Sequence, residues 1–566
     1  AFEVGESWTT GINWTPKFHT TIWKKTAATT DWNTASNWST GYVPTSDVHV
    51  IIPTGATRYP EISNTGAASK NITVNTSATL TINKGYDLTV AGNFTNRGTV
   101  TLNSDADEFA SIIVGGTSSG NIVYNRYVNT VGTNEWDLIG SPVDGLSISS
   151  FTSTNDSPLA TGGGSGGNQY AIGYYDNSAD DWTNYTTATI GAAGNFDIGK
   201  GYQMATDSGA TMAFTGTIAT SDQTQSIINN HGNGSGRRWN LVANPYPSYL
   251  NANTNAHATN NLLSVNSSVI DSNYLAIYGY DADGSGYTIY NHASGTTYIA
   301  PGQGFMVAAS SSSAADLSFT EAMQTTSGGD DFISGDIMEN TEVVIKIFNG
   351  DNELDSTKLF FDEGLTFGLD PGYDAGHFDD NAPIMTRLVE EDEGHGIAIN
   401  AMGVDAMENA VIPLVINQSA GQEFRINLHT ATITDPNVYL EDTEEGTFTN
   451  LYEEDFVLTP TSDLSGVGRF FLHMTADTMS NGEVSTSMLN AYKEVNANYI
   501  TVEGLATQPN ETKVRLYNIL GSQVLSTTLQ NNIGIQTIST VGMATGIYIV
   551  ELESGTDRLT KKLIIH

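Results

Sequence analysis

Acidic and hydroxyl side chains near the middle of the chain have the spacing of a calcium-binding loop. Asp281, Asp283 and Ser285 would supply side-chain oxygens at positions 1, 3 and 5, and the main-chain carbonyl of Tyr287 would supply position 7. Ca²⁺ prefers oxygen ligands in this arrangement. Position 12 is His292 instead of a bidentate glutamate, so we expect a weak Ca²⁺ site or one completed from elsewhere. The alternative is an Asp- and Gly-rich hairpin turn.

A second group of carboxylates, in the most acidic part of the chain, is a weaker Ca²⁺ candidate. Its members are Asp351, Glu353, Asp355, Asp370 and Asp374. Carboxylates from neighbouring loops can converge on a hard cation. Charge runs of this kind are also common on solvated faces, and the sequence leaves both interpretations open.

Tryptophan is concentrated at the N-terminal end. Five of the eight tryptophans lie within the first 38 residues. Indole rings stack on sugars and are frequent at interfaces, so Trp32 and Trp38 are candidates for a glycan- or partner-binding surface. Large aromatic side chains more often fill a core, and we favour that interpretation.

No catalytic constellation stands out in the sequence. The Gly-x-Ser-x-Gly motif matches residues 116–120 and 163–167, but neither match precedes a helical pattern. There is no His-Glu-x-x-His motif, and the absence of cysteine excludes thiol catalysis, disulfides and Cys-ligated zinc. Glycoside hydrolysis needs only two facing carboxylates, and 62 acidic residues make that signal uninformative. We therefore expect no enzymatic activity and no cofactor other than Ca²⁺.

The composition excludes several classes of partner. The 566 residues include 22 Lys and Arg against 62 Asp and Glu, which gives a net charge of −40. Phosphate binding needs basic side chains that displace counterions, so we expect no binding to nucleic acid. No run of about 18 apolar residues is present, and we expect no transmembrane segment.

The elements that must position these residues are short β-strands. Runs of Val, Ile, Thr and Tyr alternate with polar residues and are broken by Gly, Asn, Asp or Ser, whereas long helical periodicity is almost absent. The whole chain is therefore predicted to be all-β. Between residues 71 and 116 the strands recur closely enough to indicate a small β-helix, with an ordinary β-meander as the alternative.

Two segments of the chain are copies of each other. Residues 136–142 (WDLIGSP) align with 239–245 (WNLVANP), and 199–202 (GKGY) align with 302–305 (GQGF), both at an offset of 103. A third match between them pairs Tyr175 with Tyr280. Three matches in the same order predict a duplicated β domain of about 100 residues.

We predict five domains. They are a Trp-rich β-helix-like domain at 1–125, two β repeats at 126–228 and 229–330, an acidic β-sandwich at 337–475, and an Ig-like β-sandwich at 485–566. Residues 330–475 hold 30 acidic and 5 basic residues, so most of the negative charge lies in the fourth domain.

The C-terminal 80 residues resemble the sorting domain of proteins exported by the type IX secretion system of Bacteroidota. The residues that carry this resemblance are Leu516, Tyr517 and Gly521 in Leu-Tyr-Asn-x-x-Gly, Gly546 and Tyr548 in Gly-Ile-Tyr, and Lys561 and Lys562 near the terminus. The Pro-Asn-Pro segment common at the start of such domains is absent. Residues 337–475 are similar to the β-sandwich that often precedes them.

The resemblance implies a location and a set of partners. It implies export through the type IX translocon to the outer cell surface or the medium, with an outer-membrane β-barrel shuttle protein reading the sorting domain. We expect a non-catalytic protein that acts as an adhesin or as a structural subunit of a surface layer or filament, and that contacts copies of itself in a polymer. The alternative is a glycan-binding or carbohydrate-active secreted protein.

Overall fold

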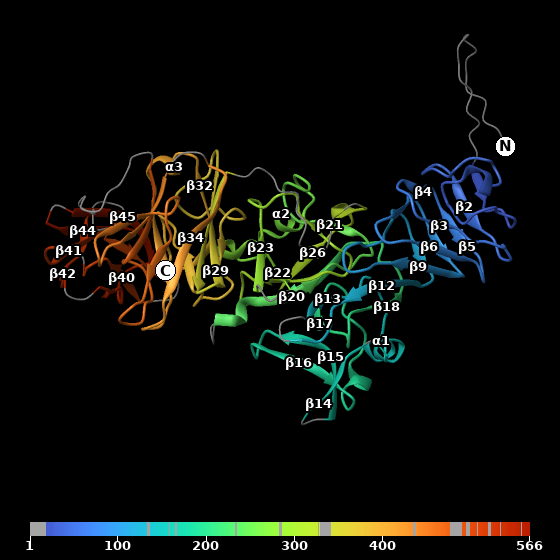
Figure 1. Ribbon diagram of the computed structural model, residues 1–566, viewed down its shortest axis with the longest axis horizontal. Coiled ribbons are helices and arrows are strands. Elements are labelled where there is room, and N and C mark those ends of the chain that lie inside the picture. Colours follow the sequence, from blue (N-terminus) through green and yellow to red (C-terminus); the bar gives the residue numbers. More distant parts are fainter. Residues whose placement is uncertain are drawn as a thin grey trace, which may run out of the picture. The chain divides into compact units, whose positions relative to one another are not determined.

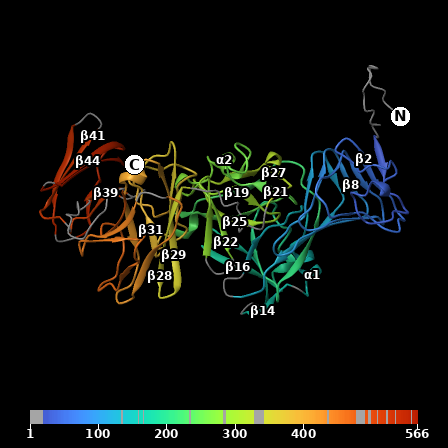
Figure 2. The ribbon, with the colours of Figure 1, turned by 45° about the horizontal axis from the view of Figure 1, so that its top comes forward.

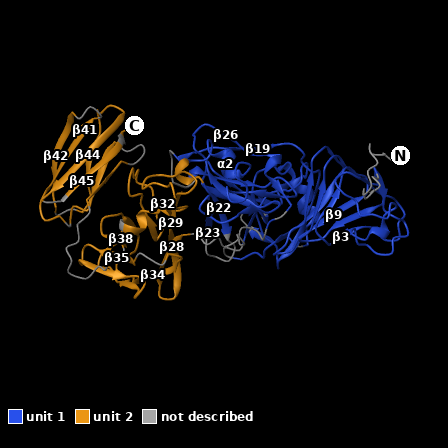
Figure 3. Ribbon diagram, turned by 90° about the horizontal axis from the view of Figure 1, so that it is seen from above, with its two compact units in different colours: residues 1–271, 276–336 blue, residues 272–275, 337–566 orange. Residues whose placement is uncertain are grey.

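The computed structural model describes most of the chain beyond residue 18. The described ranges are 19–132, 136–157, 159–164, 167–231, 235–281, 286–326, 328, 341–433, 437–475, 489–493, 498–506, 508–518, 522–531, 534–555 and 557–565. Two compact units divide the chain: unit 1 comprises residues 1–271 and 276–336, and unit 2 comprises 272–275 and 337–566 (Figure 3). Within the described ranges, no helix is long and apolar enough to cross a membrane.

Unit 1 begins with a three-sided β-solenoid. One side has the order β1-β2-β5-β8-β11, a second β4-β7-β10, and a third β3-β6-β9-β12. The bounds are β1 Thr20–Ile22, β2 His49–Ile52, β3 Glu61–Ile62, β4 Ala67–Ser69, β5 Ile72–Val74, β6 Thr79–Ile82, β7 Asp87–Val90, β8 Phe94–Asn96, β9 Thr99–Asn103, β10 Ser111–Val114, β11 Ser118–Ser119 and β12 Ile122–Val128. Figure 1 shows β2 and β5 side by side, with β3, β6 and β9 on another side.

Parallel pairing shows that this domain is a β-helix and not a meander. Val50 pairs with Ile72, and Ile72 pairs with Phe94, so the chain returns to the same side after one full turn. All three side chains are buried, because alternate residues of each short strand point into the solenoid. Stacked turns bury each other's apolar faces, which confirms the β-helix prediction.

The two sequence copies fold with the same strand order. The first has the order β13-β17-β15, with β16 and β14 both on β15, and the second has β20-β25-β22-β23. Their bounds are β13 Asp137–Ile139, β14 Thr161–Gly164, β15 Gly167–Asp176, β16 Asp181–Thr186, β17 Tyr202–Met204, β20 Trp239–Ala243, β22 Ile277–Asp281, β23 Gly286–Tyr290 and β25 Gly304–Ala308. Ile139 pairs with Tyr202, and Val242 pairs with Phe305, so the register repeats at the sequence offset of 103.

A short helix packs in the same way in each copy. α1 (Ile148–Thr154) precedes Asn155, whose side chain bonds both backbone groups of Ala213 in β18 (Ala210–Gly216). α2 (Leu262–Asn266) ends at Asn266, which bonds both backbone groups of Ser318 in β26 (Ala315–Phe319). The amide of asparagine can donate and accept at once, so it matches a main-chain N–H and C=O pair.

Smaller elements complete unit 1. They are β19 Gln223–Ile227, β21 Tyr249–Asn251, β24 Tyr298–Ile299, β27 Gln324–Thr325 and the 3-10 helices η1 Ala35–Asn37, η2 Ile190–Ala192, η4 Ser235–Arg238 and η6 Glu321–Met323. β19 pairs with β26, and β21 pairs with both β24 and β27.

The acidic domain, residues 341–475 of unit 2, is one hydrogen-bonded sheet of eleven strands. Its order is β36-β35-β38-β33-β31-β32-β29-β28-β34-β37, and β30 pairs with β32. The bounds are β28 Glu342–Asn349, β29 Asn352–Asp362, β30 Ala375–Gly376, β31 Ile384–Thr386, β32 Ile397–Gly403, β33 Val411–Ile416, β34 Phe424–Ala431, β35 Asn437–Asp442, β36 Thr447–Asn450, β37 Phe456–Leu458 and β38 Phe470–Thr475; α3 is Ala406–Asn409. Val343 and Leu359 from one half and Ile412 and Leu472 from the other share one core, as in a sandwich.

The C-terminal domain, residues 489–565, is a two-sheet β-sandwich. One sheet has the order β39-β40-β43, and the other has β42-β41-β44-β45. Figure 2 shows β41 and β44 of the second sheet side by side. The bounds are β39 Asn490–Tyr492, β40 Tyr499–Glu503, β41 Thr512–Asn518, β42 Gln523–Leu529, β43 Gln536–Ser539, β44 Gly546–Ser554 and β45 Asp557–Ile565. Val502 from the first sheet and Leu516 and Val550 from the second lie in one core, so the predicted Ig-like sandwich is confirmed.

Candidate functional site

The tryptophans at the N-terminal end form a core. Trp23, Trp32 and Trp38 are fully buried. The Trp38 ring lies 5.0 Å from the Trp23 ring and 4.8 Å from the Trp32 ring, edge to face in both cases. The hypothesis of a glycan or partner surface at Trp32 and Trp38 is therefore wrong, because no ring face is open to a ligand. Trp8 and Trp14 lie outside the described residues.

The first Ca²⁺ candidate falls on a hairpin. Asp281 pairs with Gly286 where β22 meets β23, and residues 282–285, which include Asp283 and Ser285, lie outside the described residues. The Tyr287 ring packs against that of Tyr280, 5.3 Å away. Burial lowers the pKa of His292 to about 4, and its Nδ1 accepts a hydrogen bond from the main-chain N–H of Thr254. Position 12 of the loop is therefore a neutral imidazole, and Ca²⁺ binding here stays a prediction.

The second Ca²⁺ candidate does not form a cluster. Glu353 pairs with Lys346 at 2.8 Å, and Asp355 pairs with His377 at 3.2 Å. Asp370 instead accepts hydrogen bonds from the main-chain N–H and the hydroxyl of Thr366, and these bonds stabilise the turn that contains both residues. Asp351 lies exposed at the β28–β29 turn. Among the described residues, no three His, Asp or Glu side chains are arranged to hold a metal ion, so the predicted convergence is wrong.

Asp374, the remaining member of that group, is a buried structural carboxylate. Its two oxygens accept hydrogen bonds from the main-chain N–H groups of Asp370, at 2.6 Å, and Ala401, at 2.7 Å. Burial raises its pKa to about 7, although these two hydrogen bonds act in the opposite direction. It therefore titrates near neutral pH without facing a ligand.

Residues of the predicted sorting signal lie in the four-stranded sheet of the C-terminal domain. Leu516 fills its core, and the Tyr517 hydroxyl donates to the carboxylate of Glu551 at 3.1 Å. Gly546 begins β44, and the buried Tyr548 donates its hydroxyl hydrogen to the carbonyl of Ala544 at 2.8 Å. Gly521 lies outside the described residues.

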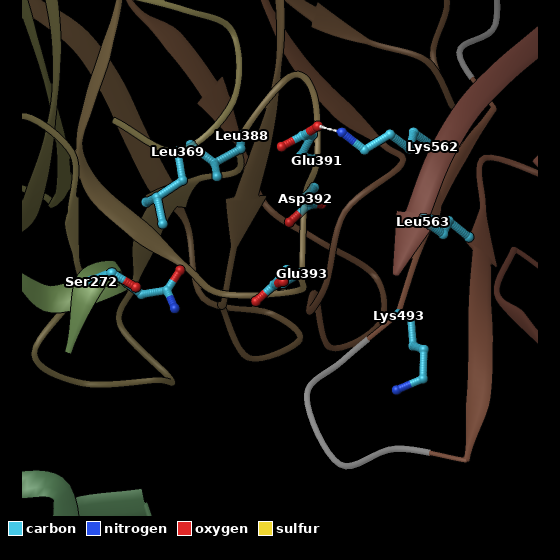
Figure 4. A pocket seen from close by; sticks show the side chains of 10 residues that line it. Ser272, Leu369, Leu388, Glu391, Asp392, Glu393, Lys493, Lys562 and Leu563 are labelled. Carbon is cyan, nitrogen blue, oxygen red and sulfur yellow. Dashed lines mark hydrogen bonds and ion pairs between the residues drawn. The ribbon is translucent and has the colours of Figure 1, made fainter. Parts of the chain in front are cut away.

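The two lysines of that signal, both in β45, contact other parts of unit 2. Lys561 is buried, and its Nζ donates to Oδ1 of Asn490 at 3.0 Å. Lys562 is exposed and forms an ion pair with Glu391 of the acidic domain. A cavity of about 270 Å³ lies beside this pair. In Figure 4 its wall carries Glu391, Asp392 and Glu393 on one side and Lys562 on strand β45 on the other.

A buried network of charged and polar groups lies behind the cavity wall. Arg387 donates through Nε to Oδ1 of Asp392 at 3.1 Å, and both side chains are almost fully buried. The Arg387 guanidinium lies over the ring of Tyr492, 4.3 Å from its centroid. The Tyr492 hydroxyl donates to Oε1 of Glu503 at 2.7 Å. Arg387 and Asp392 belong to the acidic domain, and Tyr492 and Glu503 to the C-terminal domain.

Burial and neighbouring charges shift the pKa values in this network. Burial raises the pKa of Glu503 to about 7, with opposition from Arg387 and from the Tyr492 hydrogen bond. Burial lowers the pKa of Lys561, with opposition from Asp392. Burial also acts against the charge of Arg387, but Asp392, Tyr492 and Glu503 together raise its pKa. Each of these charges is therefore sensitive to the loss of another.

Sequence reasoning missed this network and, of its members, singled out only Lys561. Arg387 is one of just five basic residues between 330 and 475, and that rarity was the available signal. Asp392 is one of 30 acidic residues in the same segment, so nothing in the sequence distinguished it.

The Gly-x-Ser-x-Gly motif at residues 116–120 places Ser118 in solenoid strand β11, not at a strand-to-helix turn.

The all-β fold and the C-terminal domain together define an exported protein that carries a C-terminal sorting domain. Residues 496–566 match the secretion system C-terminal sorting domain. Residues 22–474 match the family described as a domain of unknown function (DUF8693), and the chain belongs to that family. The protein is therefore cargo of the type IX secretion system of Bacteroidota. It is exported to the cell surface or the extracellular space and interacts with the type IX machinery.

Comparison with other proteins adds no function. No curated protein matches the chain. A crystal structure of the extracellular domain of a one-component system from B. thetaiotaomicron aligns at 11% identity with a TM-score of 0.10. That alignment covers 27% of this chain and 28% of the other, so the chain spans little more than a quarter of that structure's length. A likeness this weak carries no argument.

Proposed function

We propose that this exported chain is a non-catalytic surface protein, an adhesin or a structural subunit of a surface layer or filament. The observation that carries the proposal is the continuity of unit 1. β12 pairs with β9 on one side and with β18 on the other, so the solenoid sheet runs directly into the first repeat. A surface scaffold needs such joints, because flexible linkers would not transmit force or hold a fixed geometry.

The two repeats are also joined by main-chain hydrogen bonds. The N–H of Gly140 donates to the carbonyl of Gly302 at 2.8 Å, and the N–H of Ala243 donates to the carbonyl of Gly199 at 2.8 Å. The two donors, Gly140 and Ala243, are equivalent positions of the two copies, and so are the two acceptors, Gly199 and Gly302. Each copy therefore donates the same bond to the other, and the copies pack with an approximate two-fold relation. Paired surfaces of this kind are usual in symmetric dimers, and they make the repeats one body.

The solenoid also bonds the second repeat. Buried Arg126 of β12 donates to Oε1 of Gln303 at 2.9 Å, and the Ser111 hydroxyl donates to the carbonyl of Thr326 at 3.1 Å. The solenoid and both repeats are thus mutually connected, and this supports a scaffold role over that of a string of independent modules. The glycan-binding alternative has lost its candidate residues, because Trp32 and Trp38 are buried.

The partners beyond the secretion machinery follow from the same proposal. An outer-membrane β-barrel shuttle protein would read the C-terminal domain, and further copies of the chain would meet in a polymer. With a net charge of −40, such copies repel each other at low ionic strength. Contact between them therefore requires salt screening or a divalent cation.

The experiment is to image the full chain and to measure its mass in solution by sedimentation. We expect monomers at low salt, and assemblies of intact chains when salt or Ca²⁺ is added. Dissociation by a chelator at constant ionic strength would place Ca²⁺ at the joints. In parallel, cells lacking the gene should lose a surface layer, a filament or adhesion. A chain that stays monomeric in every condition, with unchanged cells, would contradict the proposal.

A further inference from the structure

The acidic domain and the C-terminal domain meet through buried charges, which is unusual for two domains of one chain. Arg387 and Asp392 come from the acidic domain, and Glu503 and Lys561 from the C-terminal domain. All four are at least nine-tenths buried. Buried charges are costly unless each is paired, so this contact tolerates few alternative arrangements.

The two sides of the contact bring different sets of buried charges. The acidic domain contributes one positive and one negative group, bonded to each other at 3.1 Å. The C-terminal domain contributes Glu503 and two buried lysines, Lys493 and Lys561. Tyr492 connects the two sides, because its ring contacts Arg387 and its hydroxyl bonds Glu503. A wrong partner would leave buried charges of either side without their counterparts.

Apolar and surface contacts surround this polar centre. Ala382, Met385, Val415 and Val467 of the acidic domain form a small buried cluster with Tyr492. At the rim, half-exposed Glu391 pairs with half-exposed Lys562. The apolar cluster and the charged rim follow the usual anatomy of an interface, whereas the buried charges at its centre depart from it and make the contact depend on their pairing.

We propose that the acidic domain is a docking site for the chain's own C-terminal sorting domain, which it holds through Arg387, Asp392 and Glu391. The docked domain presents β45 to the acidic domain, with Lys561 buried and Lys562 paired. These are two of the residues that carry the likeness to sorting domains. While the domain is docked, neither lysine is free for another protein, so the export machinery must displace the contact to bind them.

The proposal has a direct consequence for proteolysis. If the chain is cut between the two domains, the C-terminal domain stays bound without a covalent link. The chain has no cysteine, so no disulfide would hold the pieces together. Retention after cleavage therefore measures docking itself.

The experiment uses the full chain with a site-specific protease sequence inserted between residues 476 and 488. After cleavage, the C-terminal piece should co-elute with the rest in size-exclusion chromatography at micromolar concentration and neutral pH. Arg387→Ala should weaken retention by about a hundredfold, because it leaves Asp392 and Glu503 buried without their cation. Separation of the wild-type pieces under these conditions would overturn the proposal.

Arg425→Ala is the matched control. Arg425 also lies over an aromatic ring, 4.4 Å from the centroid of Phe348, and pairs with Asp455 at 2.7 Å. Both of its partners belong to the acidic domain. Retention in this variant should equal that of the wild type, and an equal loss in both arginine variants would mean that docking is not specific.

A charge exchange at the rim keeps the test valid if Arg387→Ala fails to fold. Glu391 and Lys562 are about half exposed, so their substitution leaves the cores intact. Glu391→Lys should weaken retention several-fold, and adding Lys562→Glu should restore it. In the uncut chain, Lys562 should react faster with an acylating reagent in the Glu391→Lys variant. Failure of the second substitution to restore retention would contradict the docking geometry.

Discussion

At the residue scale, Trp38 lies between two other buried indoles in the core of the solenoid. Its indole N–H donates to the carbonyl of Trp32 at 2.7 Å, and its ring contacts two other buried indoles. The N–H of Trp23 donates to the carbonyl of Arg58 at 2.7 Å. Trp23 and Trp38 therefore combine apolar packing with a satisfied indole N–H, whereas the buried indole N–H of Trp32 has no hydrogen-bond partner.

We predict that Trp38→Ala destabilises the solenoid by about 3–5 kcal/mol, because it leaves a large cavity among the remaining indoles. Guanidinium unfolding of the full chain, followed by tryptophan fluorescence, measures this. All eight tryptophans lie before residue 240, so the signal comes from unit 1. Tyr42→Ala, at a side chain 57% exposed, should change stability by less than about 0.5 kcal/mol. Equal effects of the two substitutions would contradict the core assignment.

Asp374 predicts a pH dependence of the acidic domain. Its pKa is about 7 in the folded domain against a usual 3.8, so the unfolded chain releases its proton first as pH rises. The stability that this residue contributes is complete below about pH 4, falls between about pH 4 and 7 and is gone above that window. The loss is on the order of 4 kcal/mol.

Hydrogen exchange of the Ala401 amide, corrected for its intrinsic pH dependence, measures this effect. Protection should decline from pH 4 to pH 7 in the wild type. Asp374→Asn should be less stable at low pH, because its NH₂ faces main-chain donors, and its profile should be flatter. Asp351→Asn, at an exposed carboxylate, should keep the wild-type profile. A wild-type profile that does not decline would refute the assigned titration.

At the element scale, close approach of main chains determines how the repeats pair. A Cβ atom at Gly140 would lie 2.4 Å from the Cβ of Ala243 and 2.7 Å from the carbonyl oxygen of Lys200. Glycine at this position lets the start of one repeat reach the main chain of the other. The Gly140 and Gly302 hydrogen bond depends on that approach.

We predict that Gly140→Ala lowers the stability of unit 1 by about 1–3 kcal/mol, because the two repeats must move apart. Calorimetric unfolding of the full chain, with the transition of unit 1 assigned by tryptophan fluorescence, is the measurement. Gly162→Ala is the control, since a Cβ there would meet no atom within 4 Å. An unchanged transition in Gly140→Ala would show that the repeats tolerate a wider separation.

Asparagine side chains act at the same scale. Asn155 follows α1 and bonds it to β18. Asn266 is the last residue of α2 and bonds it to β26. The sequence comparison aligned the strands of the two copies but not these asparagines, because the loops before them differ in length. Only the structure places them at equivalent positions.

At the scale of the whole molecule, the described parts of unit 1 are connected through sheets and hydrogen bonds, and those of unit 2 through a buried charge network. The family match covers residues 22–474, and the sorting domain covers 496–566. The docking site that we propose lies where these two regions meet within unit 2. The chain would therefore carry its export signal bound to its own acidic domain.

The sequence by itself determined what depends on local pattern. Alternation of apolar and polar residues indicated β-strands, a repeated offset indicated the duplication, and the C-terminal motifs identified the sorting domain. These signals are readable because strand periodicity and short motifs depend on neighbours along the chain. The fold class and the export route were therefore predictable.

Only the tertiary structure decided which side chains come together. Trp32 and Trp38 are buried, the carboxylates from Asp351 to Asp374 take separate partners, and Arg387 meets Tyr492, which is more than a hundred residues away. Composition cannot show whether a charge faces solvent or an opposite charge from another domain. The free energy of such a group depends on its burial and its partners, and the three-dimensional packing of distant segments determines both.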